Sequence, residues 1–158
     1  METSPALHAH LEWPARQNPL RAATVKVIEA LAGAAIELSR IIAAGPLAGI
    51  RGEGGGINPD GDRQTSIDIV ADRLMRDALR TVPVAGVLSE EIELPETIDC
   101  DAPLCVAIDP LDGSANLANN ISVGTIFSIR PKGHDVISTF FEPGTAPRTA
   151  IRPRSAST

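Results

Sequence analysis

Two aspartates frame a short turn that directly follows an apolar run in the middle of this 158-residue chain. Residues 104–108 (LCVAI) have the composition of a buried strand, and the sequence DPLDGS follows them from Asp109 to Ser114. Proline fixes its own φ angle, so the backbone turns sharply and the carbonyl of Leu111 can join the carboxylates of Asp109 and Asp112. Gly113 lets the backbone approach a ligand, and the amides of Gly113 and Ser114 can bind an anion. The spacing therefore predicts a cation and an anion held by one loop.

A second acidic group follows another apolar run. Residues 84–88 (VAGVL) end in Ser89-Glu90-Glu91. Carboxylates at the ends of two neighbouring strands can converge on one point, where they repel one another unless a cation compensates them. Hard oxygen ligands suit Mg²⁺ or Mn²⁺ rather than zinc. A metal site next to an anion site is the arrangement needed for phosphoryl transfer to water. The plainer alternative is a solvated Glu90-Glu91 face and a capped turn at 109–112.

Helices are expected before the strands. Apolar residues recur at three- and four-residue steps over 23–44, and Gly45-Pro46 should end that helix. A second helix is predicted over 66–81, with Asp68 in its first turn, where the helix dipole stabilises a carboxylate. Further strands are predicted at 123–130 and 136–141. This order indicates an α/β or α+β layered fold.

The glycine-rich segment 45–61 is predicted to be a loop that moves over a site, the alternative being a disordered insertion.

Composition excludes several classes of partner. The formal net charge is −6 and no Lys/Arg-rich block occurs, so nucleic acid is not expected to bind. No apolar run is long enough to span a bilayer, so no membrane partner is expected. The N-terminus lacks the order of a signal peptide, and the two cysteines are too few for a disulfide scaffold. A cytoplasmic location is expected.

The motifs together resemble a known family. DPLDGSANLANNISVGTIFSI is similar to the signature of class I fructose-1,6-bisphosphatase, within the lithium-sensitive, metal-dependent sugar-phosphatase superfamily. The resemblance extends upstream through GGGINPDGDRQTSIDIVADRL and VLSEEIELP, downstream to FFEPGTAPRTA, and covers roughly residues 19–150. Inositol monophosphatases carry a relative of DPLDGS, but GTIF, SEE and the G-D-x-Q-x-x-x-D segment favour the bisphosphatase. The implied fold is α/β (α+β layered), with helices packed on a mixed, largely antiparallel sheet.

The resemblance also implies a set of metal ligands. The family's ligands for two or more Mg²⁺ ions, which Mn²⁺ can replace, correspond here to Glu90, Glu91, Asp109, Asp112 and the carbonyl of Leu111.

Catalytic and phosphate-binding roles follow from the same resemblance. Asp68 corresponds, with Glu91, to the pair that orients and deprotonates the attacking water, and Asp62 lies in the segment that resembles the family's mobile loop. Gly113 and Ser114 correspond to the residues that hold the departing phosphate. Ala115 stands where the family usually has a second serine, so one hydroxyl contact is lost while the backbone amide remains.

The implied activity is Mg²⁺-dependent hydrolysis of the 1-phosphate of fructose 1,6-bisphosphate to fructose 6-phosphate, in gluconeogenesis or the Calvin cycle. Sedoheptulose 1,7-bisphosphate is a second possible substrate, and intact relatives are expected to be homo-oligomers. We expect an N-terminal extension (1–18), a phosphatase N-terminal domain (19–150) and a tail (151–158) that departs from the family. The sugar-binding C-terminal domain is then missing, so the chain is expected to be truncated, with little activity alone. The alternatives are a broader sugar or inositol monophosphatase and an inactive metal-binding fragment.

Overall fold

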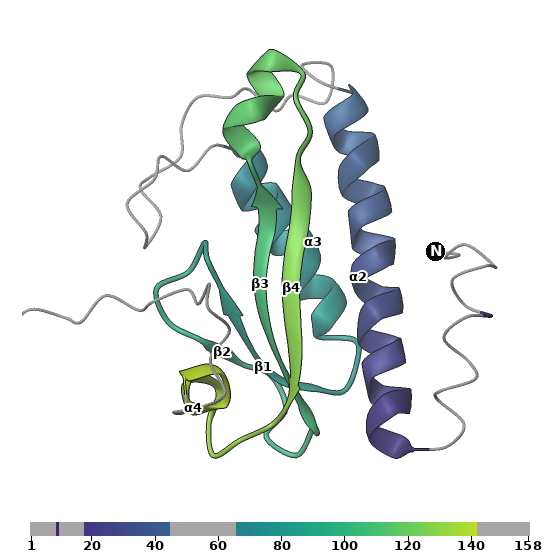
Figure 1. Cartoon of the computed structure of the whole chain (residues 1–158), viewed down its shortest axis with the longest axis vertical. Coiled ribbons are helices and arrows are strands. Elements are labelled where there is room, and N and C mark those ends of the chain that lie inside the picture. The colour runs from purple at the N-terminus through teal and green to yellow at the C-terminus, as the bar shows by residue number, and fades with distance from the viewer. Residues whose placement is uncertain (1–8, 10–17, 45–65, 142–158) are drawn as a thin grey trace, which may run out of the picture.

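The computed structural model describes residue 9 and residues 18–44 and 66–141 of the chain (Figure 1). The elements are α2 (Pro19–Ala44), α3 (Ser66–Leu79), β1 (Val84–Ser89), β2 (Glu96–Thr97), β3 (Leu104–Asp112), the 3₁₀ helix η2 (Ser114–Asn119), β4 (Gly124–Pro131) and α4 (Val136–Phe141). The predicted glycine-rich loop, Asp62 and the tail at 151–158 lie outside the described residues. Among the helices described, none has the length and hydropathy that a membrane span requires.

The sheet is mixed and has the order β2-β1-β3-β4. β1 and β3 are parallel, whereas β2 pairs with β1 and β4 pairs with β3 in antiparallel fashion. This confirms the expectation of helices packed on a mixed, largely antiparallel sheet. In the β1–β3 ladder, Val87 pairs with Val106 and Ser89 pairs with Ile108. Because the two strands are parallel and adjacent, the segments that follow them leave the sheet at the same edge.

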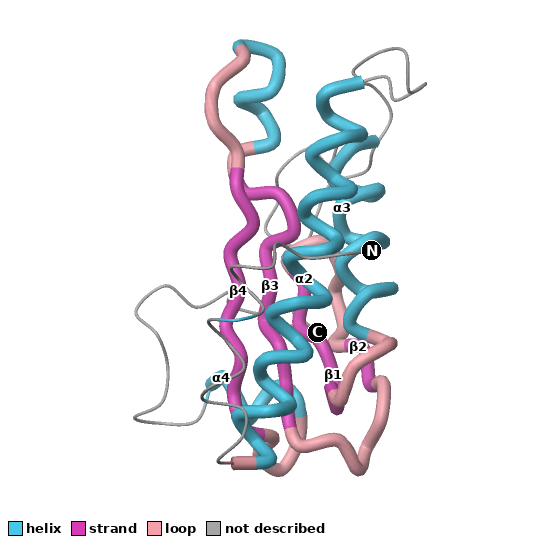
Figure 2. Tube along the Cα trace, turned by 90° about the vertical axis from the view of Figure 1, so that its right-hand side faces the viewer, coloured by secondary structure: helices cyan, strands magenta, loops and turns pink. Residues whose placement is uncertain are grey.

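Helices α2 and α3 pack together against one face of the sheet (Figures 1 and 2). Asn18 caps α2, since its side-chain Oδ1 accepts a hydrogen bond from the Leu20 amide at 2.8 Å, and Pro19 occupies the first helical position. The helix therefore begins four residues before the predicted start at residue 23. The buried side chains of both helices recur at three- and four-residue steps and meet those of β1 and β3: Val27, Leu31, Leu38, Ala71, Met75, Leu79, Val84, Leu104, Val106 and Ile108.

Residues Val136–Phe141 form the helix α4, so the strand predicted there is wrong. The reason is a reciprocal cap at the start of the helix. The Ser138 amide donates to Asp135 Oδ1 at 2.7 Å, and the Asp135 amide donates to Ser138 Oγ at 3.0 Å. The helix covers the opposite face of the sheet, where a smaller core contains Ala85, Leu88, Ala102, Cys105, Val136 and Phe140.

Candidate metal and phosphate site

The DPLDGS turn begins inside β3, at an irregularity in its pairing with β4. Asp109 lies opposite Ile126, whereas Asp112 lies opposite Gly124. Two residues of β3, Pro110 and Leu111, therefore stand against a single residue of β4, which is the arrangement of a β-bulge. Such a bulge inserts one residue into the alternation of the strand and changes the face to which the later side chains point.

The core confirms this change of face. Ile108 and Leu111 both belong to the cluster beneath α2 and α3, although residues three positions apart in a regular strand point to opposite faces. Asp109 and Asp112 each follow one of these two residues, so they share the other face. The bulge thus brings together two carboxylates that a regular strand would separate.

Local hydrogen bonds fix the turn. Asp109 Oδ1 accepts the amide N–H of Leu111 at 3.1 Å, and the hydroxyl of Thr125 donates to the Pro110 carbonyl at 2.9 Å. Gly113 has φ 78° and ψ 26°, a left-handed conformation that glycine adopts without steric cost. The glycine is therefore required by the backbone of this turn. Its carbonyl accepts the Asn116 amide at 2.8 Å, which begins η2.

The end of β1 places Glu90 beside Asp109. The Glu90 amide donates to the Ile108 carbonyl at 3.1 Å, so the Glu90 side chain leaves the backbone close to Asp109 and acts on the pKa of that carboxyl. Burial raises the pKa of the Asp109 carboxyl, and the Glu90 side chain and the hydrogen bond from the Leu111 amide offset part of this rise. The charges of Asp112 and Asp68 raise the pKa further, and the net shift is upward.

Asp68 reaches the same end of the sheet from a third element. It is buried in the first turn of α3, and its charge acts on Asp109. Three elements therefore bring four of the predicted acidic residues into electrostatic contact: Asp68 from α3, Glu90 after β1, and Asp109 and Asp112 from β3. Glu91 is half-buried in the turn after Glu90.

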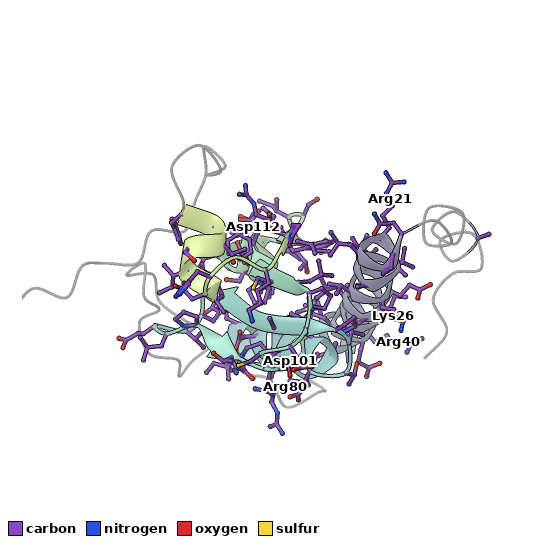
Figure 3. All side chains as sticks on the ribbon, turned by 90° about the horizontal axis from the view of Figure 1, so that it is seen from below. Arg21, Lys26, Arg40, Arg80, Asp101 and Asp112 are labelled. Atoms are coloured by element: carbon purple, nitrogen blue, oxygen red, sulfur yellow. The ribbon has the colours of Figure 1, made fainter. Side chains whose placement is uncertain are left out.

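The donor chemistry fits a hard divalent cation, because all the side chains are carboxylates and their mutual repulsion is relieved by positive charge. A closed ligand cage is not formed: within the described ranges, no three His, Cys, Asp or Glu side chains make a group able to hold a metal ion. Arg21, Lys26, Arg40 and Arg80 lie well apart from Asp112 in Figure 3. None of these four cations neutralises that carboxylate.

The predicted phosphate-binding residues lie directly after the acidic turn. Ser114 is half-buried and Ala115 is exposed, and both belong to the first turn of η2. Ser114 and Ala115 therefore belong to the same short segment of the sequence as Asp112. The remaining predicted residue, Asp62, lies outside the described part of the chain.

Sequence reasoning missed a buried polar pair beneath the Glu90-Glu91 turn. The Ser89 hydroxyl donates to Asp72 Oδ1 at 2.7 Å, and Arg76 donates to Asp72 Oδ2. The four-residue spacing of Asp72 and Arg76 on a predicted helix was the available signal, since such pairs interact. Nothing in the sequence pairs Asp72 with Ser89.

Comparison with known proteins places the chain among the sugar-bisphosphate phosphatases. Residues 10–147 match the family described as "Fructose-1-6-bisphosphatase, N-terminal domain". The chain belongs to this family, and the resemblance expected from the DPLDGS, SEE and GTIF segments is confirmed.

The relatives are longer than the chain. It is 65% identical over 150 residues to the class 1 fructose-1,6-bisphosphatase 2 of Bradyrhizobium sp. (strain BTAi1), covering 95% of this chain and 42% of that protein. It is 68% identical over 124 residues to the class 1 enzyme of Bradyrhizobium sp. (strain ORS 278), covering 78% of this chain and 35% of that one. The chain thus spans well under half the length of these two relatives.

Solved structures show the same fold. The Leishmania major fructose-1,6-bisphosphatase in holo form superposes with a TM-score of 0.70 at 24% sequence identity, over 79% of this chain and 39% of that one. A structure titled as a putative sedoheptulose-1,7 bisphosphatase from Toxoplasma gondii gives a TM-score of 0.59 at 26% identity, over 70% of this chain and 34% of that one. The arrangement of α2, α3 and the mixed sheet is therefore that of the bisphosphatases.

Proposed function

We propose that the chain carries the metal- and phosphate-binding part of an enzyme that hydrolyses the 1-phosphate of fructose 1,6-bisphosphate. The proposal rests above all on the pairing of Glu90 with Asp109 at the ends of two adjacent parallel strands. The names of the relatives, which are fructose-1,6-bisphosphatases, support the substrate. The products are fructose 6-phosphate and inorganic phosphate, and the reaction belongs to gluconeogenesis or to the Calvin cycle.

In this proposal Glu90, Glu91, Asp109 and Asp112, with the Leu111 carbonyl, hold two or more Mg²⁺ ions, which Mn²⁺ can replace. A bound divalent cation lowers the pKa of water and stabilises the charge that develops on the transferred phosphoryl group. The bulge at Pro110 and Leu111 keeps the two aspartates on one face, with Asp109 half-buried and Asp112 exposed at the end of the strand.

Proton transfer is assigned to Asp68 together with Glu91. Asp68 is buried at the start of α3, beside the acidic turn, so its carboxylate is held in one place by the helix. From there it orients the attacking water and accepts its proton, and the amides of Gly113 and Ser114 hold the departing phosphate. Ala115 contributes its amide alone. Asp62 is proposed to close over the site.

Sedoheptulose 1,7-bisphosphate is a second candidate substrate, since the Toxoplasma gondii structure of the same fold carries that name. The proposal also includes a phosphatase N-terminal domain over 19–150, a cytoplasmic location, and homo-oligomeric assembly of the intact enzyme. So does low activity of the chain alone, because binding energy from distant parts of a substrate normally helps to position the reacting group.

The test is phosphate release by two proteins: the 158-residue chain, and the chain joined after residue 147 to the remaining C-terminal part of the BTAi1 relative. With Mg²⁺, we expect turnover of fructose 1,6-bisphosphate by the joined protein and trace turnover by the chain alone. An Asp109→Asn variant of the joined protein is the inactive control. A folded joined protein without turnover contradicts the proposal, and preference for inositol 1-phosphate supports the monophosphatase alternative instead.

A further inference from the structure

A buried serine hydroxyl lies directly beneath the turn that carries Glu90 and Glu91. Ser89 is the last residue of β1, is 1% exposed and donates its hydroxyl hydrogen to Asp72 Oδ1 at 2.7 Å. The same hydroxyl oxygen accepts the backbone N–H of Glu91 at 3.3 Å. One hydroxyl group therefore connects helix α3 to the acidic turn.

Asp72 is itself held in a single orientation. It is 4% exposed, and the Nε and Nη2 atoms of Arg76 donate to its Oδ2 at 2.8 and 2.6 Å. Arg76 Nη1 donates in turn to Glu96 Oε2 at 2.9 Å, which connects the network to β2. Both carboxylate oxygens of Asp72 are thus engaged, one by Ser89 and one by Arg76. A buried ion pair adds little net stability compared with apolar packing, so a role in fixing geometry accounts better for it.

A second backbone contact completes the fixation of the turn. The Glu90 amide donates to the Ile108 carbonyl of β3, and the Glu91 amide donates to the Ser89 hydroxyl. Two successive peptide groups are therefore held, one against the neighbouring strand and one against α3 through Asp72. With both peptides fixed, the directions in which the side chains of Glu90 and Glu91 leave the backbone are fixed as well.

We propose that Asp72 and Ser89 are positioning residues, which orient Glu90 and Glu91 without touching a cation or the substrate. The proposal rests on the function proposed above for what the two glutamates bind, while the orientation itself can be measured without any ligand. Groups that orient metal-binding side chains commonly contribute about 10- to 100-fold to metal affinity.

The test compares four versions of the 158-residue chain: wild type, Ser89→Ala, Ser89→Thr, which keeps a hydroxyl, and the control Ser39→Ala. Ser39 is an exposed serine of α2 whose hydroxyl donates to the Ile36 carbonyl at 2.8 Å, far along the chain from the acidic turn. Amide hydrogen exchange at Glu91 reports the turn, exchange at Val106 in β3 reports the fold, and Mn²⁺ titration followed by electron paramagnetic resonance reports affinity.

In Ser89→Ala we expect Glu91 exchange to be about tenfold faster, as for the loss of one ordinary hydrogen bond, with Val106 unchanged. Mn²⁺ should bind at least about tenfold more weakly. Ser89→Thr should restore both quantities, and Ser39→Ala should alter neither. Should Ser89→Ala lose protection at Val106, Asp72→Asn, which is nearly isosteric, takes its place with the same expected direction.

Unchanged Glu91 exchange in the folded variant overturns the positioning role. So does a Ser89→Thr protein that behaves like Ser89→Ala, because side-chain volume rather than the hydroxyl would then matter. Failure of the wild-type chain to bind Mn²⁺ counts against the proposed function instead, and in that case the exchange rates alone decide whether Asp72 and Ser89 orient the turn.

Discussion

Asp109 and Asp112 lie on the same face of β3, although three positions of one strand separate them. The bulge at Pro110 and Leu111 makes this possible. It also brings the two carboxylates close enough to repel each other, and the Asp112 charge therefore raises the pKa of Asp109. A bulge that serves only to end a strand has no need to bring two carboxylates together. The geometry of β3 therefore supports the proposal that Asp109 and Asp112 bind a cation.

Replacing Asp112 by asparagine should have opposite effects on binding and on stability. We expect Mn²⁺ affinity to fall by about tenfold or more, as one charged ligand is lost. Without the cation the free energy of unfolding should rise by about 0.5–1 kcal/mol, because Asp109 is less strongly repelled. Calorimetric titration and urea unfolding measure the two effects. Asp101→Asn, at an exposed aspartate before β3, is the control and should change neither. Equal Mn²⁺ affinities for wild type and Asp112→Asn would remove Asp112 from the ligand set.

The acidic segments were predictable because their signals are local. An apolar run followed by DPLDGS specifies a strand and a change of backbone direction within about ten residues, and β1 ends at Ser89, next to the predicted acidic pair. The strand predicted to end at residue 108 instead continues through Asp112, so both aspartates lie within β3 and not after it. The bulge could not be predicted, because it is defined by the pairing of β3 with β4. The Ser89–Asp72 hydrogen bond joins residues 17 positions apart on different elements, so it too depends on the tertiary structure.

The error at Val136–Phe141 has a different origin. Six residues rich in β-branched and aromatic side chains fit a strand and a short buried helix equally well. The deciding signal was Asp135 followed three residues later by Ser138, which forms the reciprocal helix cap. That pattern is visible in the sequence, and giving it more weight than β-propensity would have identified α4.

Asp68→Asn should separate catalysis from metal binding. In the joined protein described above, we expect kcat to fall by roughly 10²- to 10⁴-fold, the usual contribution of a general base. Mn²⁺ affinity should stay close to that of the wild type, because Asp68 is assigned to the water and not to the cation. Asp77→Asn, on the exposed side of the same helix, is the matched control. Near-normal kcat in the Asp68 variant would exclude the role as base.

Glu96 should make the chain sensitive to acid. Burial alone would raise the pKa of Glu96, but the hydrogen bonds from Arg80 and Arg76 outweigh it and lower the pKa below its usual value of 4.5. A carboxyl whose pKa is lowered by folding stabilises the fold above its unfolded pKa, and this contribution is lost as the pH falls through the lower, folded value. Stability should therefore decrease below about pH 4.5, by roughly 1–2 kcal/mol from this group.

The measurement is urea unfolding over a pH series. Glu96→Gln should unfold more easily at neutral pH and lose this part of the pH dependence, whereas Glu93→Gln, at an exposed position nearby, should follow the wild-type curve. Parallel curves for wild type and Glu96→Gln below pH 4.5 would mean that the two arginines do not stabilise the carboxylate.

Gly86→Ala should destabilise the contact between β1 and α4. A Cβ atom at Gly86 would collide with the Val136 side chain and would approach the Glu96 carbonyl oxygen at 2.8 Å. Overpacking of this kind commonly costs about 1–3 kcal/mol. Gly124→Ala is a matched control, since a Cβ there meets no atom within 4 Å. Thermal unfolding followed by circular dichroism compares the two. A Gly86 variant as stable as the Gly124 variant would show that α4 can shift away from the added methyl group without loss of stability.

Self-association of the chain should involve β4. Residues 136–141, predicted as a strand, form α4, and Phe140 is buried against the sheet. Two adjacent exposed apolar side chains lie on β4, one of the two outer strands of the described sheet, where Ile126 is 59% and Phe127 41% exposed. Because consecutive strand residues point to opposite faces, both faces of β4 are uncovered at this point.

Ile126→Lys should weaken this association. Burying one isoleucine side chain contributes about 1.5–3 kcal/mol, so the substitution should weaken dimer formation by about tenfold or more, and a charged side chain on an outer strand also opposes pairing with another strand. Sedimentation velocity over a range of concentrations measures the effect. Leu94→Lys is the control, since Leu94 is 77% exposed but lies in the segment between β1 and β2, away from β4. If the wild-type chain sediments as a monomer at every concentration, or if Ile126→Lys associates as strongly as Leu94→Lys, then β4 is not the surface through which the chain associates.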